Sequence, residues 1–225
     1  MKRFWWVGPS LLLCAFVFAS PSTVLAQTYR RGTAKPEPAV APDEPGLPGR
    51  SPVTIRKIYG PGRKGMVQTP VFQTSVGRGN KPLRDWGMIS AAYETQPEWI
   101  DELTVTFYVL SLVNSQGKTA YSLYRRDVRY MDVKRGRDHI ADVYLRPSAL
   151  ERYGEVVAVG VEFTVKGEVV AELGESSLGN QIPAKWWKDP KIVKSEVVTQ
   201  RDGYLLTRVE SPFGWINSDD YEAIK

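Results

Sequence analysis

The sequence predicts an all-β protein built as an antiparallel β-sandwich, and three observations lead to this fold class. Residues 99–113 alternate between apolar and polar side chains, as a strand with one buried face does. Further short strand-like runs follow at intervals typical of a sandwich. Residues 157–173 form two such runs around Lys166-Gly167, a two-residue turn of the kind that joins antiparallel strands.

The ends of the chain are expected to lie outside this sandwich. Residues 1–26 have a basic start, an apolar run and small residues before position 27, which is the pattern of a signal peptide. Gly8 and Pro9 interrupt the apolar run, so a transmembrane helix is the weaker interpretation. A lipoprotein would need Cys14 as its first mature residue, which the preceding Leu13 argues against. We expect export to the periplasm, the cell surface or the medium.

Composition limits what the exported part can be. Cys14, the only cysteine, lies in the segment expected to be removed, so a hydrophobic core must stabilise the mature protein without disulfides. Loss of Lys2 and Arg3 lowers the formal charge from +5 to +3. The remaining basic residues are spread among acidic ones, which argues against nucleic-acid binding.

The predicted organisation has four parts. After the signal peptide, residues 27–52 are rich in proline and form a linker that favours extended conformations. Residues 53–177 form the sandwich, and residues 178–225 form a C-terminal hairpin and tail that pack on it. The expected strands of the sandwich are Val53–Tyr59, Met66–Val76, Trp86–Glu94, Leu103–Val113, Thr119–Leu123, Val128–Val133, Ile140–Arg146, Val156–Val165 and Glu168–Leu173.

Local patterns add four details. Residues 147–154 predict a short helix with a capping Ser148 and a terminal Gly154. The apolar phase changes between Leu123 and Val128, which predicts a bulge or break at residues 125–127. Residues 192–200 and 204–210 predict a second hairpin around residues 201–203. Residues 60–65 match G-x-G-x-x-G, but no helix pattern follows, so a glycine-rich turn is favoured over a dinucleotide site.

The sequence offers little catalytic or metal chemistry. His139 is the only histidine, and no nucleophile accompanies it, so we expect a surface residue. Two carboxylate pairs, Asp101-Glu102 and Asp219-Asp220, are interpreted as solvated turn residues, since neighbours on a strand point opposite ways. Without a mature cysteine, and with one histidine and no calcium-loop pattern, we expect no metal or other cofactor.

Aromatic residues are the candidates for binding. Such rings can stack on sugars or anchor a protein partner, because they bring large apolar area with few rotatable bonds. The alternative, which we favour, is that they plug the ends of the sandwich. The candidates are Trp99, Trp186, Trp187, Phe213 and Trp215.

Several motifs together resemble a known family. They are Pro97–Val105, Lys134–His139 leading into Val143–Pro147, Leu150–Gly154, and Ser211–Phe213 with Asp220–Glu222. They are similar to exported immunoglobulin-like β-sandwich proteins of Akkermansia and related Verrucomicrobia-type bacteria, one of which is encoded beside type IV pilus genes. The resemblance implies an immunoglobulin-like fold and a role at pili or in the cell envelope, and it carries over no site residues.

From the sequence we therefore expect a non-enzymatic module of the cell envelope that binds a protein partner through strand edges or end loops. The alternative is a glycan-binding module that uses Trp186, Trp187 and Trp215. Exposed tryptophans in a row would favour glycan binding, and buried ones would favour the structural role.

Overall fold

The structure is a computed structural model that describes residues 51–60, 62, 65–70, 83–115 and 117–214. Several predictions lie outside these residues: the signal peptide, nearly all of the linker, much of the turn at residues 60–65, the end of the strand expected at residues 66–76, and Asp219-Asp220. Within the described residues no helix is long and apolar enough to cross a membrane.

Two very long strands organise the fold. β3 (Asp85–Ser115) and β4 (Lys118–Leu145) pair antiparallel from Ser115↔Lys118 to Gly87↔Leu145. The sequence predicted five shorter strands here. The pairing instead continues through the intervening residues, with register shifts at Tyr93/Thr95 and Thr95/Trp99. Such irregularities let a strand bend, so the hairpin changes direction around Pro97, and we call this bend the corner.

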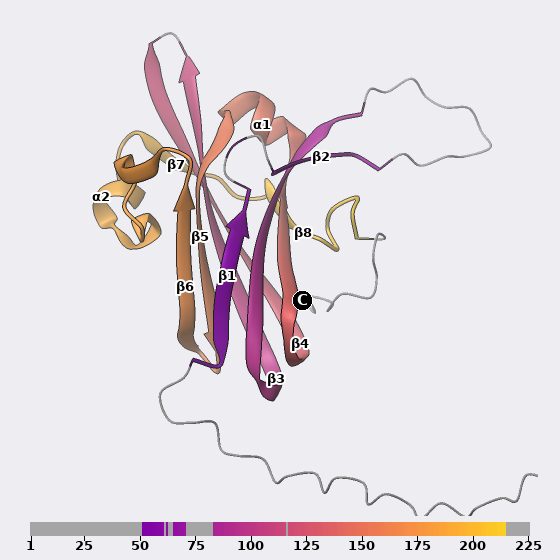
Figure 1. Cartoon of the computed structure of the whole chain (residues 1–225). Helices are drawn as coiled ribbons and strands as arrows, with labels where there is room; N and C mark the ends of the chain where they lie inside the picture. The colour runs from indigo at the N-terminus through magenta and orange to yellow at the C-terminus, as the bar shows by residue number, and fades with distance from the viewer. Residues whose placement is uncertain (1–50, 61, 63–64, 71–82, 116, 215–225) are drawn as a thin grey trace, which may run out of the picture. The chain divides into compact units, whose positions relative to one another are not determined.

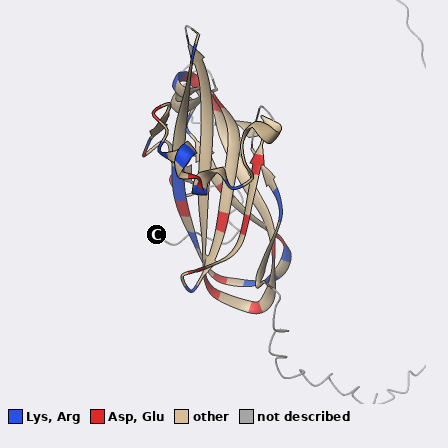
Figure 2. Cartoon of the chain, turned by 90° about the vertical axis from the view of Figure 1, so that its left-hand side faces the viewer, with Lys and Arg blue, Asp and Glu red and all other residues tan. Residues whose placement is uncertain are grey.

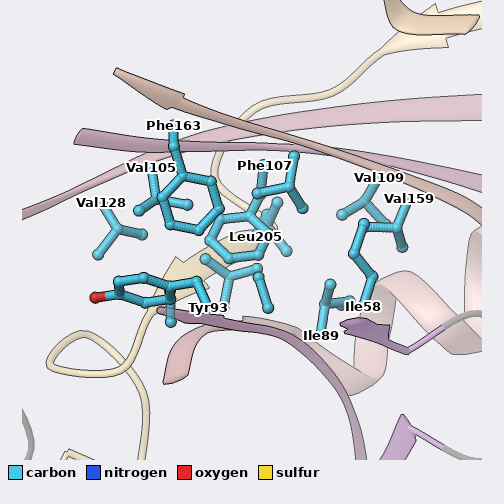
Figure 3. Packing of buried hydrophobic residues seen from close by; sticks show 14 of the residues in the cluster. Ile58, Ile89, Tyr93, Val105, Phe107, Val109, Val128, Val159, Phe163 and Leu205 are labelled. Carbon is cyan, nitrogen blue, oxygen red and sulfur yellow. The ribbon is translucent and has the colours of Figure 1, made fainter. Parts of the chain in front are cut away.

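The corner divides one sheet into two layers. In the first layer, β1 (Val53–Tyr59) and β2 (Met66–Gln68) pair with the N-terminal half of β3. The second layer has the order β6-β5-β3-β4-β7 and includes β5 (Glu155–Val165) and β6 (Glu168–Ser176) (Figure 1). The two layers face each other across the core: the Tyr93 and Phe163 rings, one from each layer, lie 4.8 Å apart (Figure 3).

This arrangement confirms the predicted all-β antiparallel sandwich. The alternating residues Leu103, Val105, Phe107 and Val109 are all completely buried between the layers. Ile58 and Ile89 meet them from the first layer, and Val159 from β5 (Figure 3). The alternation of residues along this strand therefore predicted correctly which side chains face the core and which face outward.

The bulge expected at residues 125–127 is absent. β4 keeps regular pairing there, with Tyr108↔Arg125, Phe107↔Arg126 and Thr106↔Asp127. The apolar phase changes because both faces of this part of β4 are buried. Tyr124 and Val128 point into the sandwich, whereas Tyr121 and Leu123 belong to a second hydrophobic cluster on the outer face.

Residues 177–197, which we call the strap, cover that second cluster. The strap follows β6 and contains two short 3-10 turns, η2 (Gly179–Gln181) and η3 (Trp186–Lys188), and one helical turn, α2 (Pro190–Val193). Trp186 and Trp187 of η3 pack on Leu110, Leu123 and Ala158 of the second layer.

The predicted C-terminal hairpin does not form. β7 (Val198–Gln200) pairs in parallel with the N-terminal half of β4, and β8 (Leu205–Thr207) pairs antiparallel with its C-terminal half. The Arg201 amide donates to the Leu123 carbonyl at 2.9 Å, and the Arg146 amide donates to the Tyr204 carbonyl at 3.0 Å. Residues 201–203, which were predicted to form a turn, therefore cross from one half of β4 to the other.

Two local predictions are confirmed, with one correction. β5 and β6 form the expected hairpin, and Lys166 and Gly167 take φ values of 51° and 83°, as a type I′ turn requires. The helix α1 spans Pro147–Tyr153 and ends at Gly154 with φ 81°. Its N-cap is Arg146 rather than Ser148, since Pro147 supplies the first helical residue, and the helix start has no side-chain capping hydrogen bond.

Candidate functional site

Most of the predicted binding aromatics are structural. Trp186 and Trp187 are 1% and 6% exposed beneath the strap's own backbone. Phe213 is 6% exposed, with its ring stacked 4.6 Å from Tyr144 and edge-on to Trp86 at 5.8 Å. None of these three side chains presents a flat face to solvent. Trp215 lies outside the described residues.

Trp187 is held by a specific arrangement of strands. Its indole lies over Gly160 of β5 and Gly174 of β6, which are cross-strand neighbours, and a Cβ at either position would overlap the ring. The ring also stacks on Tyr108, with centroids 6.0 Å apart. Paired glycines inside strands signal close approach by another group, and this was the sequence feature that could have located the strap.

A polar cluster fastens the strap to the sheet. The Trp187 indole N–H donates to Glu162 Oε1 at 3.0 Å, and the Tyr108 hydroxyl donates to Oε2 at 3.2 Å. Lys188 bridges Glu162 and Glu172, and Lys185 also pairs with Glu172. Burial, and next the Glu162 charge, raise the pKa of Tyr108. The hydrogen bonds from Lys185 and Lys188 lower the pKa of Glu172. We call these residues the latch.

Trp99 is the exception among the candidate aromatics that the structure describes. It lies at the corner with 53% of its surface exposed, and the Lys134 ammonium lies 5.8 Å from its ring centroid. Trp99 forms part of the wall of an open groove of about 700 Å³ on the outer face of the second layer. The groove is lined by Pro52, Pro97, Trp99, Ile100, Asp101, Glu102, Thr104, Thr106, Arg125, Asp127, Thr164, Val165, Lys166 and Gly167.

The floor of the groove consists of polar side chains on three adjacent strands. Thr104 of β3 lies opposite Thr164 of β5, and Thr106 lies opposite Asp127 of β4. Arg125 and Asp127 form a side-chain pair at 3.4 Å, with more than half of each side chain exposed. Hydroxyl, carboxylate and guanidinium groups thus lie side by side on one surface.

His139 is buried, contrary to the prediction of a surface residue. It is 5% exposed and stacks on Tyr93 with ring centroids 5.1 Å apart. The sequence did contain a sign of this burial: His139 shares the strand face of the buried residues Ala141, Val143 and Leu145, two positions apart along β4. Burial lowers its pKa and favours the neutral ring.

The surroundings of His139 support the corner of the fold. Its Nε2 lies 3.2 Å from Thr95 Oγ1, whose hydroxyl donates to the Lys134 carbonyl at 2.8 Å and accepts from the Gly136 amide at 3.0 Å. The Thr95 proton is therefore directed to the backbone and away from the ring, which is not the arrangement of a base activating a nucleophile.

The carboxylates at the corner lie in a strand and not in a turn. Asp101 and Glu102 of β3 are both exposed and both line the groove, and Glu102 pairs with Arg129 at 3.1 Å. Among the residues described by the structure, no group of three or more His, Cys, Asp or Glu side chains is placed to hold a metal ion. Charges of both signs are interspersed over the strands (Figure 2).

Comparisons with known proteins agree with this architecture. A protein-family model matches residues 63–225 of the chain. The fold is similar to the crystal structure of a protein from Akkermansia muciniphila, with a TM-score of 0.61 and 23% sequence identity over 77% of this chain and 92% of that one. No curated protein matches the sequence.

Proposed function

We propose that this chain, which belongs to the family whose model matches residues 63–225 and has a fold similar to that of a protein from Akkermansia muciniphila, is an exported, non-enzymatic interaction module of the cell envelope, associated with type IV pili. It acts by accepting an extended segment of a protein partner at the free edge of β6. Added strands of this kind gain affinity from main-chain hydrogen bonds and specificity from alternate side chains.

The edge of β6 is the observation that carries this proposal. β6 is the outermost strand of the second layer, and no other described strand pairs with its far side. Near its start, β1 lies close by and the Ser51 hydroxyl donates to the Val170 carbonyl at 2.7 Å, so the open part of the edge begins after Val170. The Ser177 amide donates to the Val157 carbonyl at 2.9 Å, which sets the phase of the β5–β6 ladder. In that phase the main-chain groups of Glu172 and Gly174 point away from β5, toward a strand that could be added.

The side chains of β6 also suit an added strand. Val169 and Leu173 are large apolar residues that are 50% and 37% exposed. β6 also carries Glu168, Glu172 and Glu175, so its edge is mixed. Exposed apolar side chains on such an edge favour pairing with another chain.

The other open edge differs in kind. Beyond the residues that pair with β7, β4 carries Arg125, Asp127 and Arg129, and Arg126 pairs with Glu210. Charged residues along an edge oppose pairing with further strands. Both edges carry charges, but only β6 adds exposed large apolar side chains, Val169 and Leu173, so β6 is the receptive edge.

The arrangement of titratable groups supports a non-enzymatic role. The ring of His139 lies in the core at the corner, where it contacts Thr95 and Tyr93. The carboxylate of Glu162 accepts hydrogen bonds from Tyr108 and Trp187 within the latch. A catalytic site needs a base, an oriented partner and a reacting atom within hydrogen-bond reach.

Site-specific photocrosslinking in the native cells tests the proposal. A photoreactive residue at Leu173 should crosslink to one envelope protein, expected to be a pilus component. The same residue at Val209, an apolar side chain 58% exposed elsewhere, is the matched control. The substitution Leu173→Lys should abolish the crosslink from Val169. Equal crosslinking from positions 173 and 209, or persistence after Leu173→Lys, would contradict the assignment.

A further inference from the structure

The outer face of the second layer changes character along its strands. Beneath the strap it is apolar, and Leu110, Leu123 and Ala158 are buried there. Past the row of Tyr108 and Glu162 the same strands present hydroxyls and charges, and the chain that the structure describes places no packing layer over them. The groove at Trp99 is therefore a polar surface on the outside of the sheet and not a packing defect in the core.

The charges of the groove indicate an uncharged ligand. Asp101, Glu102 and Asp127 bring three carboxylates, which disfavour a polyanion. Arg125 and Lys166 nearly balance them, so an isolated cation would gain little. An acyl chain would find a polar floor, where burial leaves the lining groups without hydrogen-bond partners.

The hydrogen-bonding groups indicate a ligand with many hydroxyls. Thr104, Thr106 and Thr164 each can donate and accept, Arg125 only donates, and Asp127 only accepts. Thr106 is only 7% exposed, so it has few rotamers to lose on binding. A sugar ring carries several hydroxyls around its rim, and each can donate and accept a hydrogen bond, which matches this mixture of donors and acceptors.

Trp99 completes the match with its apolar ring at one wall. Aromatic side chains give large, stiff contact area, and sugars have flat faces of C–H groups that pack on it. The groove volume of about 700 Å³ lies within the range of about 300–1,000 Å³ usual for small-ligand sites.

We propose that this groove binds a neutral oligosaccharide, with Trp99 as the stacking platform and Thr104, Thr106, Thr164, Arg125 and Asp127 as the hydrogen-bonding floor. This inference goes beyond the protein-binding edge at β6 and uses a different surface. Of the aromatic candidates that the structure describes, only Trp99 lines the groove. The buried pair Trp186 and Trp187 packs in the second cluster and does not line the groove.

Titration of the full mature chain with defined glycans tests the proposal. The probes are chitotetraose, maltotetraose and di-N-acetyllactosamine as neutral ligands, and a heparin tetrasaccharide as the anionic comparator, measured by tryptophan fluorescence and calorimetry. At least one neutral probe should bind, and the heparin tetrasaccharide should bind more weakly than that probe.

Matched variants locate the site. Trp99→Ala should weaken binding by about tenfold or more, as removal of a central aromatic contact does. Tyr59→Ala, which removes an aromatic ring 47% exposed on β1, should leave affinity unchanged. Asp127→Asn should weaken binding with no change in the unfolding midpoint. Leu173→Lys should bind the glycan normally, which separates this proposal from the β6 edge.

Three results would overturn the assignment. One is no binding of any neutral probe at millimolar concentration. Another is equal affinity in Trp99→Ala and the unsubstituted chain. The third is tighter binding of the heparin tetrasaccharide than of every neutral probe.

Discussion

The outer face of the second layer has one half covered by the strap and one half open at the groove, and the two halves differ in their outward side chains. Under the strap, β3, β4 and β5 present Leu110, Leu123 and Ala158 outward. At the groove the same strands present Thr104, Asp127 and Thr164. On β3 the inward residues Leu103, Val105, Phe107 and Val109 are apolar in both halves, so both halves are equally good strands. The outward residues alone determine whether the chain's own C-terminal segment packs there.

Trp186→Ala should have the largest effect on stability, because it removes a buried side chain from the half that the strap covers. The side chain is 1% exposed and packs edge-on against Trp187. We expect the free energy of unfolding to fall by about 3–5 kcal/mol, from lost transfer energy and the remaining cavity. Urea unfolding measures this. Trp99→Ala in the open half is the control, and an equal loss in both variants would contradict the comparison.

Glu162→Ala should have the next largest effect, because Glu162 lies at the boundary between the halves. The substitution leaves the Trp187 indole N–H and the Tyr108 hydroxyl without their acceptor. Unpaired buried donors cost about 1–3 kcal/mol, so we expect a loss of about 2 kcal/mol in urea unfolding. Glu162→Gln keeps one acceptor oxygen and should lose less. An unchanged midpoint in Glu162→Ala would show that the latch does not hold the strap.

The latch should also give the strap a dependence on pH. The lysine contacts lower the pKa of Glu172 in the folded protein, so the unfolded chain binds a proton more readily. The contribution is present above the ordinary pKa of a glutamate and is lost as pH falls through the lowered value. Because the pair is partly exposed, we expect at most about 1 kcal/mol. Comparing acid unfolding of Glu172→Gln with the unsubstituted chain measures it; identical acid profiles would refute the prediction.

Substitutions in the open half should have the smallest effect on stability. Thr104→Ala and Asp127→Asn remove groups that the fold does not need, and we expect changes within about 0.5 kcal/mol. Thermal unfolding of both variants provides the measurement. A loss approaching that of Glu162→Ala would mean that the groove residues stabilise the sandwich and are not free for a ligand.

The inner face of the fold was predictable from the sequence because one period governs it. Leu103 to Val109 alternate without exception, and all four apolar residues lie in the core. The β5–β6 turn was equally clear, since Lys166-Gly167 supplies a residue pair able to take positive φ. These features depend on neighbours in sequence, which is the information that a pattern contains.

The outer face was predicted poorly because its environment comes from distant residues. The phase change after Leu123 indicates burial on both faces, yet the burial is caused by a strap more than fifty residues later. His139 was misassigned for a similar reason: its polar neighbours indicated the surface, whereas alternation with Ala141 placed it inside. In the candidate site, Trp99 was predicted, but the threonine floor depends on cross-strand register that no local pattern specifies.

The crossing from β7 to β8 delays folding until the C-terminal segment has been synthesised. Leu205 is 2% exposed in the core, and the segment around it joins both halves of β4 by main-chain bonds. A chain synthesised only as far as residue 200 lacks this buried residue, so the nascent polypeptide cannot close its interior as it emerges. Folding waits for almost the last part of the described chain, and such distant contacts make it slow.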